Sequence, residues 1–307
     1  MSESGQPSPA LRADPKLRVD SKAALVSEIS PVVRPAAAAH SSEPSHFITD
    51  FIDDLWGYRE LLYFFAWRDV KVRYRQAVLG IAWAVIQPLF SMILFSLIFG
   101  RMVHVPSNGI PYPIFSYCAL VPWTYFSSVV SQASNSIAGN ASLVTKVYFP
   151  RMLLPAGTAL AALLDFAVAS VLLIGMMFYY HVTTSWLLLL TPLAVALMIL
   201  TTLGVSLFTA ALTVRYRDVR HLLPFLIQLW MFATPIIYPA TMVPAKFRRI
   251  LALNPCWGVV DSFRACLLPN QPIDFKLIGC SLAVAVIVLV AGAYYFKKME
   301  KIFADII

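Results

Sequence analysis

A cluster of charged side chains lies directly before a long apolar segment of this chain, and it is the first place where chemistry can be expected. Its members fall within eight positions: Arg68, Asp69, Lys71, Arg73 and Arg75. After Arg75 the next charged residue is Arg101. Arginine and lysine bind phosphate oxygens, and they also flank the cytoplasmic ends of membrane spans. The cluster therefore predicts contact with phosphates rather than catalysis.

Placed on an α-helix, positions 61–75 separate into three faces. One face is aromatic and apolar and holds Tyr63, Trp67, Val70 and Tyr74. A second face is basic and holds Arg68, Lys71 and Arg75. The third carries Asp69 and Arg73, spaced as an i, i+4 ion pair. We expect this helix to lie in the headgroup zone of a membrane. A plain positive-inside anchor for the next span is the alternative.

A second candidate site is the loop GNASLVTKVYFPRMLLP, positions 139–155. A short helix that ends where Phe149 precedes Pro150 would leave apolar side chains exposed. Those expected to protrude are Leu143, Val147, Tyr148 and Phe149. Apolar surface that protrudes into water usually marks a partner. The loop therefore predicts a docking element for another polypeptide.

Residue types that catalyse reactions or bind metals are sparse. Asp165 is the one acid well inside an apolar segment, and we expect it to bond a Ser or Thr of a neighbouring span rather than to relay protons. Asp218 and His221, in RYRDVRH, indicate a charged helix start rather than a metal site. The sequence predicts no catalytic residue and no metal ligand.

The cysteine spacing and the lack of a nucleotide-binding motif also argue against a metal site and an ATPase site in this chain. The four cysteines show no paired metal spacing, and free thiols are favoured over a disulfide between Cys256 and Cys266. The sequence contains no G-x-x-x-x-G-K-[ST] phosphate loop. The chain is therefore not expected to be an enzyme by itself, and any ATP hydrolysis would belong to another chain. A membrane-embedded glycosyltransferase or acyltransferase is the alternative from another class.

The composition places these features in a membrane protein. The 307 residues are 59% hydrophobic and 13% charged, with a mean hydropathy of +0.72. A soluble domain is about a quarter charged. The net charge of +8 belongs to residues that flank apolar runs, so it indicates lipid head groups and membrane orientation rather than nucleic acid.

Six apolar segments are long enough, or nearly so, to cross a membrane as helices. They cover about 77–100, 112–131, 152–180, 186–214, 222–238 and 275–296. Outside the first 50 residues, thirteen basic residues lie on the side of the two termini and six on the other side. The fold class is therefore an all-α membrane protein with both termini in the cytoplasm.

Two regions complete the organisation. Residues 1–50 are rich in Ser, Pro and Ala, which predicts a disordered cytoplasmic tail, followed by an interface helix over 51–76 and a membrane domain over 77–307.

In the last external loop, Asn254 and Pro255 predict a helix start. Trp257, Val260, Phe263 and Leu267 share one face of that helix. About 14 residues cannot span a bilayer, so a re-entrant helical hairpin is expected, with an ordinary ordered loop as the alternative.

Four stretches together resemble the permease subunits of ABC-2 type polysaccharide exporters for O-antigen, teichoic acid or capsule. They are WRDVKVRYRQAVLGIAWAVIQPL, NASLVTKVYFPR, VRYRDVRHLLPFLIQLWMFATPIIYP and LNPCWGVVDSFR, and the likeness runs over about 51–296. The resemblance implies a homodimer in the cytoplasmic (inner) membrane, joined to two copies of a separate ATPase that binds ATP and Mg. The substrate would be a lipid-linked polysaccharide, O-antigen-like, with teichoic acid, capsule or another lipid or drug as alternatives.

The resemblance also implies roles for particular residues. Positions 61–75 would gate substrate loading, through Tyr63, Trp67, Arg68, Lys71, Tyr74 and Arg75. The coupling helix would contact the ATPase through Asn140, Leu143, Lys146, Val147, Tyr148, Phe149 and Arg151. The hairpin over 246–268 would form an external gate with Arg248, Arg249, Trp257 and Phe263.

Aromatic residues of the spans could line a path for a glycan, because sugar C–H faces pack on aromatic rings. The candidates are Trp83, Phe90, Tyr117, Trp123, Tyr125, Phe126, Trp230, Phe232 and Tyr238. Packing between helices and interface belts is the competing interpretation.

Overall fold

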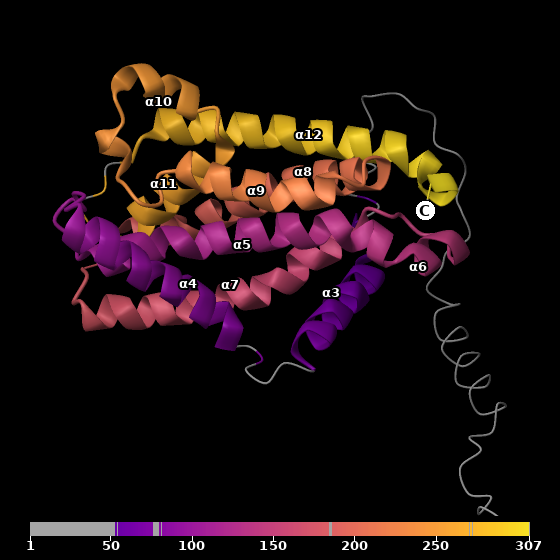
Figure 1. Ribbon diagram of the computed structural model, residues 1–307, viewed down its shortest axis with the longest axis horizontal. Helices are drawn as coiled ribbons and strands as arrows, with labels where there is room; N and C mark the ends of the chain where they lie inside the picture. The colour runs from indigo at the N-terminus through magenta and orange to yellow at the C-terminus, as the bar shows by residue number, and fades with distance from the viewer. Residues whose placement is uncertain are drawn as a thin grey trace, which may run out of the picture. The chain divides into compact units, whose positions relative to one another are not determined.

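The computed structural model describes residues 53, 55–75, 80, 82–183, 186–269, 271 and 273–306, and the part of the chain in these ranges is helical and contains no strand. The predicted tail, 1–50, lies outside the described residues. The first helix, α3 (Arg59–Tyr74), is inclined to a bundle of long helices (Figure 1). The predicted all-helical class is confirmed, whereas the division at 50 and 76 stays a prediction.

Five helical segments in the described residues are long and apolar enough to cross a membrane. They are α4 (Ala82–Phe95) continued by the π-helix η2 (Ser96–Met102), α5 (Tyr112–Gly139), α7 (Leu153–Tyr179), the 3₁₀ helix η3 (Trp186–Leu190) continued by α8 (Thr191–Arg215), and α12 (Phe275–Ile306). The predicted span at 222–238 corresponds to α9 (Val219–Phe232), whose 14 residues extend only about 21 Å. The chain is therefore a multi-pass membrane protein, and the part of it that the structure describes has five helices of spanning length where six were predicted.

Short elements join the long ones at both ends. At one end α6 (Ala141–Lys146) connects α5 to α7. At the other end η4 (Ala240–Met242), α10 (Ala245–Leu251) and α11 (Pro255–Leu267) lie between α9 and α12. Figure 1 shows α6 near the C-terminal end of α12, and α10 and α11 at the opposite end of the bundle.

Helices α8 and α12 pack closely against each other because glycines face the contact. A Cβ built on Gly204 would lie 2.7 Å from the backbone nitrogen of Leu289, and one on Gly292 would meet the carbonyl oxygen of Gly204. Such small residues let the backbones of membrane helices approach closely. Here any larger side chain would push the two helices apart.

Helix α11 confirms the predicted helix after Asn254. The Asn254 Oδ1 atom accepts a hydrogen bond from the backbone N–H of Cys256 at 3.1 Å, and Pro255 occupies the first turn. Trp257, Val260 and Phe263, on the predicted face, are 0%, 1% and 3% exposed. The helix is buried on nearly every face, so it is a core element of the bundle rather than a loosely attached loop.

Candidate functional site

Helix α3 is fixed to the bundle by one side and exposed on the other. Phe65 and Ala66 are buried, and a Cβ on Gly157 of α7 would lie 3.0 Å from that of Phe65. On the exposed side the rings of Tyr63 and Trp67 stack with centroids 6.4 Å apart. The Lys71 ammonium lies 5.5 Å from the Trp67 ring centroid. The two exposed rings of the predicted aromatic face, Tyr63 and Trp67, therefore lie beside the Lys71 ammonium group.

The other predicted faces of this helix are rearranged. The expected Asp69–Arg73 ion pair is wrong: Asp69 pairs with Arg68 at 2.9 Å, and Arg73 pairs with Asp165 of α7. Tyr74, expected beside Tyr63 and Trp67, donates its hydroxyl to Asp165 instead. The half-buried Asp165 carboxylate lies on another helix and draws Arg73 and Tyr74 away from their expected partners, which a projection of α3 alone cannot show.

The partners of Asp165 also correct the expectation for that residue. We predicted a bond to a Ser or Thr of a neighbouring span. Its two oxygens instead accept hydrogen bonds from Arg73 Nη1 and the Tyr74 hydroxyl, both from α3. Arg73 Nη2 in turn donates to Gln132 Oε1 of α5. Three elements therefore meet at one polar cluster beside the middle of α7.

The predicted docking loop contacts α3 directly. Arg68 Nη1 donates to Asn140 Oδ1 at 3.0 Å, at the start of α6. The strap, which we define as residues 147–151, follows α6. Within it, Phe149 packs on Phe65 with ring centroids 5.5 Å apart. The interface helix and the loop after α5 thus form one unit.

The predicted protrusion of this loop is only partly present. Tyr148 is 77% exposed, and Lys146 is exposed beside it. Phe149, also expected to protrude, is 5% exposed, while Leu143 and Val147 are half-buried in the same apolar cluster. The correction has a physical reason: α3 and α12 supply apolar partners that cover these side chains.

Arg151 is directed to the last helix rather than outward. Its backbone N–H donates to Glu300 Oε1 at 2.9 Å, and its Nη1 donates to the Glu300 carbonyl oxygen. Phe296, Met299 and Phe303 of α12 are buried in the cluster that holds Phe149. Helix α12 was predicted to end near residue 296, but it extends to Ile306. The longer helix is stabilised because its apolar side chains pack in that cluster.

A cavity of about 240 Å³ lies between the C-terminal end of α3, the start of α4, and α5 and α7. Its polar wall includes Arg73, Gln132 and Asp165, and its aromatic wall includes Trp83 and Phe166. Of the predicted channel aromatics, Trp83 and Tyr125 line it. The cavity adjoins the face of α3 that carries the Arg73–Asp165 pair.

Most other predicted channel aromatics are packed inside the bundle. Tyr117, Trp123 and Phe126 are at most 5% exposed, so they cannot line an open path in this conformation. The Tyr117 hydroxyl donates to the Ala169 carbonyl at 3.3 Å, and the Tyr125 hydroxyl donates to the Ala159 carbonyl at 3.1 Å. Trp230 packs on Phe126 and donates to Asn254 Oδ1 at 2.8 Å. These side chains therefore act as core residues, as the competing interpretation held.

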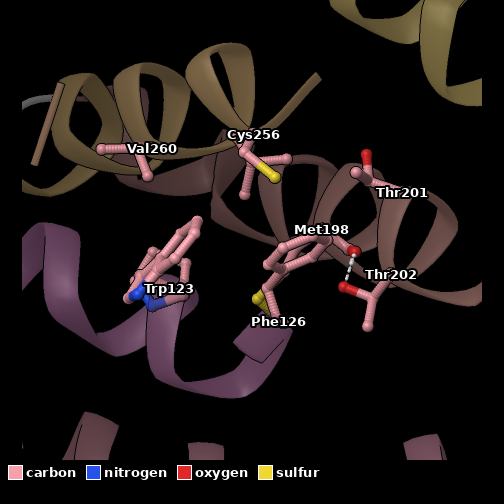
Figure 2. A pocket seen from close by; sticks show the side chains of 9 residues that line it. Trp123, Phe126, Met198, Thr201, Thr202, Cys256 and Val260 are labelled. Carbon is pink, nitrogen blue, oxygen red and sulfur yellow. Dashed lines mark hydrogen bonds between the residues drawn. The ribbon is translucent and has the colours of Figure 1, made fainter. Parts of the chain in front are cut away.

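The remaining aromatic candidates lie nearer the surface. Trp83, Phe90 and Phe232 are 55%, 66% and 52% exposed, and the half-buried Tyr238 donates to the Phe232 carbonyl. A second pocket, between Trp123, Phe126, Met198 and Cys256, has room for about one water molecule (Figure 2). It is a packing gap rather than a ligand site.

The predicted external gate is organised by a residue that the sequence analysis did not single out. Arg264 of α11 is 1% exposed and donates to the carbonyls of Phe115 at 3.2 Å, Pro235 at 2.6 Å and Ile236 at 2.6 Å. Its guanidinium also lies 3.8 Å from the Phe115 ring centroid. It thus joins α11, α5 and the irregular backbone after α9. The signal available in the sequence was a lone arginine, three residues after Asp261, on a mostly apolar helix.

The four proposed gate residues are placed differently from one another. Trp257 and Phe263 are buried, so neither is an exposed gate side chain here. Arg248 donates from Nη2 to the carbonyls of Ala240 and Val243, at 3.3 and 3.5 Å, and so stabilises the turn before α10. The side chain of Arg249 lies outside the described part of the structure.

The described residues hold no group of three or more His, Cys, Asp or Glu that could bind a metal. Cys256 and Cys266 are both free and lie ten residues apart on α11, which separates them by about 15 Å along the axis. That separation is too large for a disulfide. Asp218 precedes α9 and accepts from the His221 backbone N–H, so it is part of a helix start, as predicted.

Comparison with known proteins identifies relatives across most of the chain. The family model described as ABC-2 type transporter matches residues 60–268. An O-antigen export system permease protein RfbA of Myxococcus xanthus is 31% identical over 257 residues, which cover 83% of this chain and 98% of that protein. A protein of the same name from Klebsiella pneumoniae is 30% identical over 78% of this chain and 92% of its own length. The polysialic acid transport protein KpsM of Escherichia coli is 24% identical over 76% and 91%.

Proposed function

Because this chain belongs to the ABC-2 type transporter family, we propose that it is the membrane-spanning permease of an ATP-driven exporter of a lipid-linked, O-antigen-like polysaccharide. Two relatives that are about 30% identical over more than nine tenths of their own length are named O-antigen export permeases. Near-complete coverage means that the whole membrane domain is shared, rather than one common segment. In this proposal the chain supplies the path of the polysaccharide across the membrane, and ATP and Mg bind to a separate ATPase subunit.

The observation that carries this proposal is the unit formed by α3, α6 and the strap. Tyr148 projects from it at 77% exposure, while its neighbour Phe149 is buried against Phe65 of α3. A displacement of the exposed side would therefore move α3. An ATPase that drives transport needs such a connection to the permease. Its binding can shift the conformational equilibrium of the permease only through contacts that differ between the two conformations.

The exposed apolar surfaces support the remaining parts of the proposed assembly. Phe90, Ile93 and Leu94 of α4 and Leu97 of η2 are all at least 49% exposed, and so are Leu222, Phe225, Leu229 and Phe232 of α9. Lipid covers part of such a surface, and a second copy of the chain covers the rest in the homodimer that we propose. In that assembly, α9 and the buried segment 234–237 complete a sixth crossing. Both termini then lie in the cytoplasm, at the inner membrane.

The experiment is co-purification of the permease with the ATPase encoded beside its gene. The variant Tyr148→Ser removes the exposed ring without opening the core, so it is expected to abolish recovery of the ATPase. Tyr179→Ser is the matched control, because Tyr179 is 78% exposed at the opposite end of α7. Unchanged recovery with Tyr148→Ser, or equal loss with both variants, would show that α6 and the strap are not the coupling element.

A capsular polysaccharide is the second candidate substrate, because the polysialic acid transport relative matches 76% of this chain. The two candidates differ in the polymer and share the lipid-linked mechanism. Analysis of surface glycans in a deletion strain separates them: loss of lipopolysaccharide side chains supports the first, and loss of capsule alone supports the second.

A further inference from the structure

The connection between α8 and α9 carries three arginines in six positions, and we define residues 215–220 as the arginine turn. Arg215 ends α8, Arg217 follows it, and Arg220 lies in the first turn of α9. All three side chains are exposed, and none of them forms an ion pair with another residue of the described ranges. Asp218 is the one acid among these six residues. The arginine turn therefore presents guanidinium groups whose charge is not neutralised by the protein.

Helix α12 adds positive charge at the same end of the bundle. The contact of Gly204 with Leu289 is followed, farther along both helices, by the packing of Phe208 on Tyr295, with ring centroids 5.2 Å apart. Helices α8 and α12 therefore run parallel, and two exposed lysines beyond Tyr295 lie at the end that carries the arginine turn. They are Lys298 and Lys301. The positive surface thus attracts an anion from more than one element.

The outer face of α9 is apolar and begins directly beyond the arginine turn. Its four exposed side chains fall within a sector of about 100° on the helix. They are Leu222, Phe225, Leu226 and Leu229. The opposite face is fixed to the bundle by only two buried side chains, Leu223 and Ile227. A hydrocarbon chain can therefore lie along α9 while its head group stays at the arginines.

Tyr216 indicates that the arginine turn lies at a membrane surface. The Arg215 guanidinium lies 5.2 Å from the centroid of the Tyr216 ring, which is half exposed. Tyrosine is enriched where head groups meet hydrocarbon, and guanidinium groups bind phosphate through paired hydrogen bonds. An acidic protein would match the charges but would leave the apolar face of α9 uncovered. Positive charge followed by exposed apolar surface thus fits an amphiphile best.

We propose that the arginine turn and the outer face of α9 form a binding site for an anionic phospholipid of the cytoplasmic leaflet. The lipid phosphate accepts hydrogen bonds from the guanidinium groups, and one acyl chain lies on Leu222 and Phe225. Bound lipid fixes the start of α9, which the protein itself holds by few side chains. None of these residues lines the cavity beside Arg73, so the inference goes beyond the proposed function and holds for any exported polymer.

The test titrates the full-length chain in detergent with fluorescent cardiolipin and follows the anisotropy of the probe. Each arginine near an anionic lipid should contribute about fivefold to affinity. Arg217→Gln should therefore weaken binding about fivefold, and the triple variant Arg215→Gln/Arg217→Gln/Arg220→Gln about a hundredfold. Phe225→Asn should weaken it severalfold, because an acyl contact is lost. Unchanged affinity of either the triple variant or Phe225→Asn would overturn the site.

A matched control removes three cations from the opposite end of the bundle. The residues replaced by glutamine are Arg101, Lys246 and Lys276, all of them exposed. The net charge of the protein then changes by the same amount, and affinity for cardiolipin should be unaltered. Equal loss in both triple variants would show attraction by net charge alone and would contradict a site at the arginine turn.

Competition identifies the source of the phosphate. Unlabelled phosphatidylglycerol should displace the probe, whereas phosphatidylcholine and inorganic phosphate should not. If a polyprenyl diphosphate displaces it better than phosphatidylglycerol does, the site is one for the transported lipid and the inference is wrong. If the triple variant keeps its affinity for cardiolipin but no longer co-purifies with the ATPase, the arginines contact that partner instead. Both of these outcomes leave the exporter function standing.

Discussion

Phe65 of α3 packs against Phe149 of the strap with ring centroids 5.5 Å apart, and both side chains are at most 5% exposed. The two residues are separated by 84 positions in the chain. Their contact joins the helix beside the cavity to the segment that follows α6. In this account, a force applied at Tyr148 reaches the cavity through that contact.

The first prediction concerns the Phe149 ring. Phe149→Ala should lower the free energy of unfolding by about 3 kcal/mol, because it leaves a cavity in a buried cluster. Thermal unfolding in detergent measures the change. Tyr148→Ala is the control and should leave the midpoint unaltered, since that ring is 77% exposed. Equal midpoints for the two variants would contradict the burial of Phe149.

A second prediction addresses the hydrogen bond between Arg68 Nη1 and Asn140 Oδ1, at 3.0 Å. In a double-mutant cycle with Arg68→Ala and Asn140→Ala, we expect a coupling energy of about 1 kcal/mol. Chemical unfolding of the four proteins gives that value. Replacing Asn135 in place of Asn140 serves as the control cycle, and additive effects at Arg68 and Asn140 would refute the contact.

The third prediction tests the seam between α8 and α12. Gly204→Ala should prevent the helices from packing, because the added Cβ would lie 2.7 Å from the backbone nitrogen of Leu289. We expect loss of monodisperse protein in size-exclusion chromatography. Gly175→Ala is the matched control: a Cβ there meets no atom within 4 Å, and alanine favours the helix. Normal folding of Gly204→Ala would contradict the close approach.

The fourth prediction concerns Arg264. Arg264→Met fills a similar volume but leaves the carbonyls of Phe115, Pro235 and Ile236 without a donor. Since an unsatisfied buried polar group costs about 1–3 kcal/mol, unfolding should occur several degrees lower. Arg264→Lys supplies one charge without the planar fork, so it should recover only part of the loss. Full stability of Arg264→Met would show that these bonds are not needed.

The sequence predicted the helical class, the helix after Asn254 and an exposed Tyr148, because periodicity and capping signals are local. It could not predict that Phe149 is buried while Tyr148 is exposed. That difference depends on Phe65 and on the cluster around Phe296, which lie far away in the chain. Exposed and covered apolar side chains of a short loop look alike in a sequence.

Charge pairing was the least predictable feature of the site. On an isolated helix Asp69 and Arg73 are natural partners, yet Arg73 pairs with Asp165, which is 92 positions away. The carboxylate in the span has few other partners, so it draws the cation from α3. Likewise, hydropathy alone predicted one continuous segment over 222–238, whereas helix α9 ends at Phe232, because Pro235 and the carbonyl bonds to Arg264 stabilise irregular backbone after it.

The central claim is that this chain exports a lipid-linked polysaccharide. Its most direct test is a deletion strain, in which the lipid-linked glycan is probed with a glycan-specific lectin before and after the inner membrane is permeabilised. We expect that the glycan accumulates and becomes accessible only after permeabilisation, and that the intact gene restores it to the cell surface. A normal amount of surface glycan in the deletion strain would contradict the account.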